Sequence, residues 1–237
     1  MKSYVYVSGG KGGIGKSLMA ITLVDYMLNS GPVTLVDGDH INGDSSSVFK
    51  NKDDTSVSIH RIQIRVEDAT GQTDVSGIGQ SINFMEQEEQ HSVVVDAPAG
   101  DTVLLTSAGD LIIDACLETG YQSVFVWLVD SNDRTPANVL HQTWESLKRA
   151  NKILLVKNLR KGNNFDYFDN SEFVKRILTE SNVSTIELPK LALRLEENIR
   201  IDRMNWSDLA TKTPLGTRVE ANRLRKLLHS SLEGAGL

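Results

Sequence analysis

A glycine-rich segment near the start of the chain limits the fold more than any other feature. Residues 9–17 read GGKGGIGKS, between the apolar run 5–7 and the helix-patterned run 18–24. They contain the pattern G-x-x-x-x-G-K-[ST], in which backbone N–H groups surround phosphate oxygens, the lysine contacts the outer phosphates and the hydroxyl reaches Mg²⁺. A helix beginning near Lys16 directs the positive end of its dipole at the same anion. The flanking strand and helix patterns favour a phosphate-binding loop over the alternative, an ordinary glycine turn.

The loop contains a second lysine, Lys11, where a standard phosphate-binding loop needs no charged side chain. KGG-x-GK-[ST] is the deviant Walker A pattern, and with it the chain resembles the ParA/MinD family of ATPases. In that family the early lysine reaches across a dimer interface to the partner's nucleotide. The resemblance therefore implies this role for Lys11 and a homodimer when ATP is bound; the alternative is a solvated loop lysine. Cations supplied in trans raise phosphoryl-transfer rates by about 10³ to 10⁵.

A second motif follows a later apolar run. Residues 92–95 read SVVV and lead into DAPAG at 96–100. An apolar run of this kind is typical of a central parallel strand, and Asp96 at its carboxyl end is placed to hold Mg²⁺, usually through water. D-x-P-x-G after this strand also matches the ParA/MinD pattern, in which the following loop senses the γ-phosphate.

A third motif, Asp37-Gly38-Asp39, follows the apolar run 33–36. It resembles the D-x-D of the family's first switch, which implies that Asp39 orients the attacking water and that Asp37 supports Ser17 and Mg²⁺. Both aspartates could instead be turn residues that end a strand, since Asp and Gly favour turns. The residues that follow, 40–42, read His-Ile-Asn and not the Pro-Gln-Gly common in plasmid partition members, which leaves the chemistry of the switch and membership of that branch open.

The strand pattern at 153–157 ends in Asn158, which bears on the choice of base. GTPases use Asn-Lys-x-Asp here, but the third position after Asn158 is Lys161, which cannot accept a hydrogen bond from guanine. ATP is therefore preferred. In the resembled family the asparagine and a proline-containing segment after the next strand line the adenine, which points to Asn158 and Pro189; for Asn158, a helix cap or turn residue is the alternative.

The predicted site thus has three groups of residues, with ATP and Mg²⁺ as cofactors. The nucleotide contacts are Gly10, Lys11, Gly12, Gly13, Ile14, Gly15, Lys16, Ser17, Leu18, Asn158 and Pro189. The magnesium ligands are Ser17, Asp37 and Asp96, the aspartates through water. The catalytic residues are Lys11, Lys16 and Asp39.

Strand and helix patterns alternate along the chain, which predicts an α/β fold with a doubly wound, mostly parallel sheet. With 237 residues and 40% hydrophobic content, the chain is long enough for one sizeable domain, 1–237. Helices are expected near 17–29, 101–119, 136–150 and 216–232, and strands at 33–37, 92–96, 123–129, 153–157 and 184–188.

The polar stretch 45–90 is the least family-like part of the sequence. Its one alternating segment, 57–66, carries apolar residues at both parities, which predicts a break in register near His60 and an edge strand or hairpin beside the sheet. Partner specificity and a plain surface insertion are both consistent with this stretch.

Cysteine content and hydropathy narrow the class further. The single cysteine, Cys116, lies in an apolar helix pattern and is expected in the core, and it excludes a disulfide framework or a CxxC metal site. There is no signal-peptide pattern, so we expect the cytosol. No run of about twenty apolar residues occurs, so we expect no membrane-spanning helix. Membrane attachment through the terminal helix is disfavoured, because the chain ends EGAGL without the bulky and basic residues that an inserting helix needs.

Charge is divided unevenly along the chain. Residues 1–133 hold 7 basic and 19 acidic side chains, whereas residues 134–237 hold 18 and 12. Partition members of the family bind DNA without sequence preference through basic residues in this part, so DNA is a candidate partner. Solvated helix faces with interspersed acidic residues are the alternative. The candidates are Arg194, Arg200, Arg203, Arg218, Arg223, Arg225 and Lys226.

Three functions remain open from the sequence. The first is an ATPase switch that dimerises with ATP, is stimulated by a protein partner, and positions or mobilises a cargo such as a plasmid or a conjugation complex. The second is a metabolic enzyme on the same fold, such as a dethiobiotin-synthetase-like protein, against which Lys11 and the DAPAG segment argue. The third is an adaptor that binds nucleotide with negligible hydrolysis, which the residues after Asp39 permit.

Overall fold

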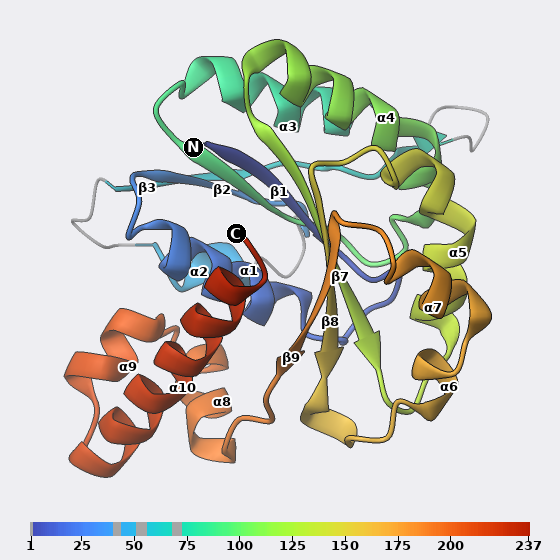
Figure 1. Ribbon diagram of the computed structural model, residues 1–237. Helices are drawn as coiled ribbons and strands as arrows, with labels where there is room; N and C mark the ends of the chain where they lie inside the picture. Colours follow the sequence, from blue (N-terminus) through green and yellow to red (C-terminus); the bar gives the residue numbers. More distant parts are fainter. Residues whose placement is uncertain (1, 40–43, 51–55, 68–72) are drawn as a thin grey trace.

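Seven parallel strands form the centre of the part of the chain described by the computed structural model, residues 2–39, 44–50, 56–67 and 73–237 (Figure 1). Their order is β3-β2-β6-β1-β7-β8-β9, and every neighbouring pair is parallel. The predicted doubly wound α/β fold is thereby confirmed. The strands are β1 (Ser3–Ser8), β2 (Val33–Asp37), β3 (Val57–Arg61), β6 (Ser92–Asp96), β7 (Gln122–Asp130), β8 (Lys152–Asn158) and β9 (Val183–Leu188).

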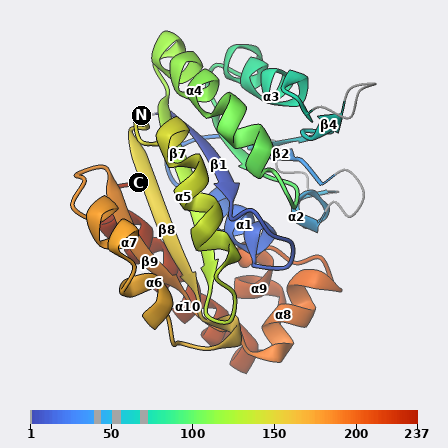
Figure 2. The same ribbon diagram turned by 90° about the vertical axis from the view of Figure 1, so that its right-hand side faces the viewer.

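Helices cover both faces of this sheet (Figures 1 and 2). One face carries α3 (Ser76–Gln87), α4 (Thr102–Thr119), α5 (Thr135–Leu147), α6 (Asp166–Asp169) and α7 (Glu172–Ile177). The other carries α1 (Lys16–Met27), α2 (Asp44–Ser47), α8 (Leu193–Arg200), α9 (Trp206–Lys212) and α10 (Leu215–Gly234), and a 3-10 turn, η1 (Leu159–Lys161), follows β8.

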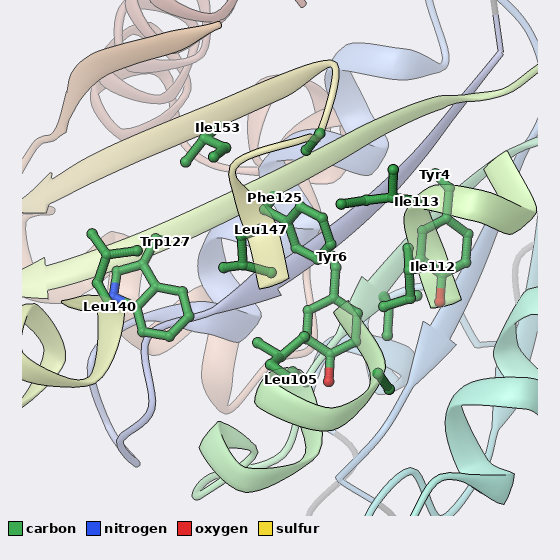
Figure 3. Packing of buried hydrophobic residues seen from close by; sticks show 14 of the residues in the cluster. Tyr4, Tyr6, Leu105, Ile112, Ile113, Phe125, Trp127, Leu140, Leu147 and Ile153 are labelled. Atoms are coloured by element: carbon green, nitrogen blue, oxygen red, sulfur yellow. The ribbon is translucent and has the colours of Figure 1, made fainter. Parts of the chain in front are cut away.

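The central strands are apolar on both sides because both sides are covered. All six residues of β1 are buried, as are the last eight of β7. Figure 3 shows Tyr6 and Phe125 beside Leu105 of α4 and Leu147 of α5. The next residues along the strands face the opposite cluster, which α1 and α10 close. Continuous valine, isoleucine and leucine runs, without alternation, are what such strands require.

The expected edge strand is present, but the predicted break at His60 is wrong. β3 pairs with β2 without interruption, from Val33 opposite Val57 to Asp37 opposite Arg61. Apolar residues occur at both parities because the edge strand is covered on both faces. Ile59 packs toward the α1 side, while His60 stacks on Phe84 of α3 with ring centroids 4.0 Å apart. A separate antiparallel pair follows, β4 (Val66–Glu67) with β5 (Thr73–Asp74).

The remaining composition-based expectations concern Cys116 and the last helix. Cys116 is free and fully buried in α4, and burial raises the pKa of its thiol to about 12, so the predicted core position is confirmed. α10 packs Ala221, Leu228 and Leu232 into the core. Among the described residues, no helix is both long and apolar enough to cross a membrane.

Candidate nucleotide-binding site

The carboxyl ends of five neighbouring strands carry polar residues along one edge of the sheet. β1, β2, β6, β7 and β8 end at Ser8, Asp37, Asp96, Asp130 and Asn158. All five side chains are buried. In open parallel sheets ligands bind outside this edge, so the three sequence motifs meet where a ligand site is expected.

The glycine-rich loop joins β1 to α1 at this edge, and its shape depends on Gly15. Gly15 precedes the first residue of α1 with a φ of 97°, and a Cβ there would lie 2.6 Å from the Asn158 Nδ2 atom. Asn158 Nδ2 donates a hydrogen bond to the Ile14 carbonyl at 2.7 Å. The loop is thereby tied to β8, and the tie leaves room only for glycine at position 15.

Lys16 lies inside the loop. Its side chain is nearly buried, and Nζ donates to the Lys11 carbonyl oxygen at 2.8 Å. This bond uses one of the three donors that a lysine ammonium carries. The ammonium is therefore held across the loop, where the first turn of α1 also presents its N–H groups.

Asp37 and Asp96 lie side by side at the ends of paired strands. Asp37 accepts hydrogen bonds from the Asp39 N–H at 3.1 Å and the Ser46 N–H at 3.0 Å, so it shapes the turn after β2 and anchors α2. Burial raises the pKa of Asp96 to about 7, against the opposing effect of the Ser45 and Ser17 hydroxyls.

The Asp96 surroundings fit Mg²⁺. Its Oδ1 atom is buried and has no hydrogen-bond partner among the described residues. The nearby groups are the Ser17 hydroxyl and the Asp37 carboxylate, and oxygen atoms of this kind are the ligands that Mg²⁺ prefers. A divalent cation supplies the positive charge that a buried pair of carboxylates lacks.

A pocket of about 390 Å³ opens above these groups. Asp39 lines it together with Lys16 and Ser17. Residues 40–42, which differ from the plasmid partition pattern, lie outside the described residues. Of the predicted nucleotide contacts, those that line the pocket are Gly12, Gly13, Gly15, Lys16, Ser17, Leu18, Asn158 and Pro189.

Three predicted contacts do not line the pocket. Ile14 points its side chain into the core, and only its carbonyl oxygen reaches Asn158. Gly10 lies against α5, where a Cβ would meet Val139 at 2.8 Å. Lys11 points away from the pocket toward the start of α5. The backbone N–H groups of a loop bind phosphate whatever their side chains do, so the loop prediction does not depend on these side chains.

Lys11 forms an ion pair with Asp133, two residues before α5 begins at Thr135. The Lys11 ammonium and the Thr135 N–H hold the pKa of the Asp133 carboxyl down at about 2. The Lys11 side chain is 42% exposed, so it is solvated as well as paired, and its role across a dimer stays a prediction. No motif in the sequence indicated this pairing within the chain.

Asn158 caps a turn and also lines the pocket. Its Oδ1 atom accepts the Arg160 N–H at 2.9 Å and so caps η1. Its side chain also lines the pocket near Pro189 and Leu191. The alternative of a cap is correct, and it does not exclude a place beside a base.

Sequence reasoning missed one wall of the pocket. It is built by Arg160 and by α8 with the turn after it. Arg160 pairs with Glu196 at 3.2 Å, and Arg203 pairs with Asp44 at 3.1 Å. The residues that this wall contributes to the pocket are Arg160, Glu196, Ile199, Arg200 and Arg203.

The basic residues that were candidates for DNA binding lie in different places in the structure, and some belong to this wall. Arg200 and Arg203 line the pocket. Arg225 donates from Nε to the buried Asp25 carboxylate of α1 at 2.7 Å, and His229 contacts the same oxygen. Arg225 thus has a partner within the fold, whereas Arg200 and Arg203 are exposed side chains beside the pocket. The rest of the set, on α8 and α10, is Arg194, Arg218, Arg223 and Lys226.

A further buried carboxyl, Asp101, lies beneath the loop at the start of α4. Burial raises its pKa from 3.8 to about 6, with opposing effects from the Ser8 hydroxyl and the Lys16 ammonium. The folded state therefore binds more protons than the unfolded state between about pH 4 and pH 6. Its contribution to stability falls as the pH rises through this window.

Asp101→Asn is expected to remove the free-energy cost of burying an ionised carboxylate. A difference of about two between the folded and unfolded pKa values corresponds to about 3 kcal/mol. The variant should therefore gain up to about that much unfolding free energy at pH 7.5 relative to wild type. Urea unfolding at pH 4 and pH 7.5 measures it: the difference between the two proteins should grow with pH. An equal difference at both pH values would show that Asp101 is not the titrating group.

The parallel sheet, the glycine-rich loop after β1 and the aspartates after β2 and β6 define the class of protein. This is the fold of P-loop nucleotide-binding proteins, the fold that the resemblance implied. A Borrelia burgdorferi protein assigned to plasmid partition and solved with AMPPNP is similar over 97% of this chain and 99% of its own, with a TM-score of 0.52 and 11% identity. MinD of Aquifex aeolicus is similar over 96% and 97%, with a TM-score of 0.48 and 16% identity.

In sequence, the chain is similar to protein MobD of Acidithiobacillus ferrooxidans. The two are 25% identical over 236 residues, which cover 98% of this chain and 97% of MobD. No family model matches the chain.

Proposed function

We propose that this protein is an ATP-dependent switch that hydrolyses ATP slowly, forms a homodimer when ATP is bound, and acts with a protein partner in the partition or mobilisation of DNA. The observation that carries the proposal is the pocket lined by the loop, Lys16, Ser17 and Asp39, together with the buried Asp96, whose carboxyl group interacts with the Ser17 hydroxyl. The similarity to MobD over nearly the whole of both chains favours a mobilisation cargo. We further propose that residues 1–237 are one domain, because the described strands of the main sheet share two continuous cores.

The residues of the pocket and the two buried aspartates at the strand ends, Asp37 and Asp96, divide the chemistry between them. The loop N–H groups and Lys16 bind the β- and γ-phosphates, and Asn158 and Pro189 line the adenine. Ser17, Asp37 and Asp96 hold Mg²⁺, which neutralises charge that develops on the phosphate oxygens. Asp39 orients the water that attacks the γ-phosphate. An arrangement of this kind accelerates hydrolysis mainly by position and charge.

Lys11 is the residue proposed to act across the dimer. Because Lys11 pairs with Asp133 within its own chain, it must exchange this carboxylate for the partner's nucleotide when the dimer forms. The pair is partly exposed, so breaking it costs little free energy, because exposed ion pairs contribute about 1 kcal/mol or less.

Two variants test this dimer. Lys11→Ala should remain monomeric with MgATP, because the cation that bridges the subunits is lost. Asp133→Asn should dimerise at a lower protein concentration than wild type, by about two- to fivefold, because Lys11 is released. Light scattering with and without MgATP measures both. If wild type and Lys11→Ala show the same mass with ATP as without it, the dimer is excluded.

A turnover assay with and without DNA separates the three functions left open by the sequence. Slow hydrolysis that DNA or a partner protein accelerates supports the switch. ATP binding without turnover under any of these conditions supports the adaptor. Turnover that requires a small carboxylate or amine co-substrate supports the metabolic enzyme and contradicts our proposal.

A further inference from the structure

Asp44 and Arg203 come from two distant parts of the chain and meet at the pocket. Asp44 is the first residue of α2, directly after the segment that follows Asp39. Arg203 lies in the turn between α8 and α9. Both line the pocket, and Arg203 Nη1 donates to Asp44 Oδ1 at 3.1 Å. The ion pair therefore joins two parts of the chain, 159 positions apart, at the rim of the pocket.

Arg203 has a strained backbone conformation, which indicates that its side chain is held in place for a function. Among the described residues it is the one non-glycine residue with a positive φ, 54°. This left-handed conformation is unfavourable for a long side chain and is tolerated by glycine, asparagine and aspartate. The surrounding turn enforces it: Met204 N–H donates to the Asn198 carbonyl at 3.0 Å, and Asn205 forms a capping box with Asp208. Strained residues of this kind cluster at ligand clamps and switches.

The other end of the ion pair is coupled to the catalytic edge. α2 is anchored through the Ser46 N–H on Asp37, the same carboxylate that holds the Asp39 N–H. On the other side, α8 places Ile199 and Arg200 in the pocket wall. A movement of either partner therefore displaces groups that lie beside the nucleotide.

We propose that the Asp44–Arg203 ion pair is a clasp across the mouth of the pocket that slows the exchange of bound nucleotide; this inference rests on the proposed function. Nucleotide that leaves the loop toward solvent passes between α2 and the α8–α9 turn, so the pair must separate first. The two side chains are 53% and 44% exposed, so the clasp is weak enough to open repeatedly. It therefore acts on the rate of release and not on the fold.

The test is the rate at which a fluorescent ADP analogue is released, measured by stopped flow after mixing with excess ATP. Asp44→Asn and Arg203→Asn should each release it about two- to fivefold faster than wild type, the range expected from one exposed ion pair. Asparagine is chosen at position 203 because it keeps the left-handed backbone. Arg203→Lys, which keeps the charge, should stay closer to wild type.

A charge swap and a matched control make the result specific. Asp44→Arg combined with Arg203→Asp restores an ion pair, so its release rate should return toward wild type although each single change accelerates release. Lys175→Asn removes the exposed Lys175–Glu172 ion pair of α7, 3.0 Å long, on the other face of the sheet, and should leave the rate unchanged.

The outcomes separate the clasp from the function on which it rests. If wild type does not bind the ADP analogue, the proposed function fails. If all variants bind it and release it at the wild-type rate, or if the swap is as fast as the single variants, the clasp is overturned while the nucleotide site stands. Thermal unfolding of each variant checks that faster release is not a loss of folded protein.

Discussion

Replacement of Lys16 by alanine is expected to lower the affinity for MgATP by about 10² to 10⁴. Lys16 is the nearly buried cation of the loop, and its Nζ atom already lies across the loop on the Lys11 carbonyl. Removal of one partner from a buried charge-assisted contact costs about 2 to 5 kcal/mol, much of it because the other charge is left unpaired. Calorimetric titration with MgATP measures the loss.

Two further variants control this measurement. Lys16→Met keeps the apolar length of the side chain, so a similar loss there assigns the effect to the charge and not to a cavity. Lys212→Ala on α9 removes an exposed lysine that pairs with Asp208 and should bind as wild type does. Wild-type affinity of Lys16→Ala would contradict the assignment of this loop as the phosphate site.

The contiguous parts of the site were predictable because one short segment dictates its own geometry. The loop places Gly12, Gly13, Lys16 and Ser17 together through local backbone conformation alone, and the edge of a parallel sheet then gathers the strand-ending residues. Asp96 needed only a run of valines before it to be placed at this edge of the sheet. The order of strands and helices followed from hydrophobic patterning in the same way.

The distant parts of the site depend on tertiary packing that leaves no local pattern. The wall formed by Glu196, Arg200 and Arg203 lies opposite the loop because α8 packs on the same face of the sheet as α1. The pairing of Lys11 with Asp133 depends on β7 being the neighbour of β1. At β3 both faces of the strand are covered, so apolar residues occur at odd and at even positions. In the sequence this pattern looks the same as a break in register.

Asp39→Ala is expected to bind MgATP with near wild-type affinity and to hydrolyse it about 10² to 10⁴ times more slowly. Asp39 lines the pocket beside Lys16 and Ser17, while its own N–H donates to Asp37. If its carboxylate orients the attacking water, the loss falls on the transition state, in the range typical of positioned acid–base groups. Without hydrolysis, the ATP-bound dimer can separate only after slow release of ATP, so this dimer should accumulate.

Asp96→Asn provides the contrasting variant. Asparagine has nearly the same shape as aspartate and suits a buried site, but it lacks the negative charge that helps to hold Mg²⁺. The loss should therefore appear in the ground state, as weaker Mg²⁺-dependent binding of ATP before any hydrolysis. Single-turnover hydrolysis at saturating MgATP, together with calorimetric affinities, separates the two variants. Wild-type hydrolysis by Asp39→Ala would assign the water to another residue, such as Asp44 on the same rim of the pocket.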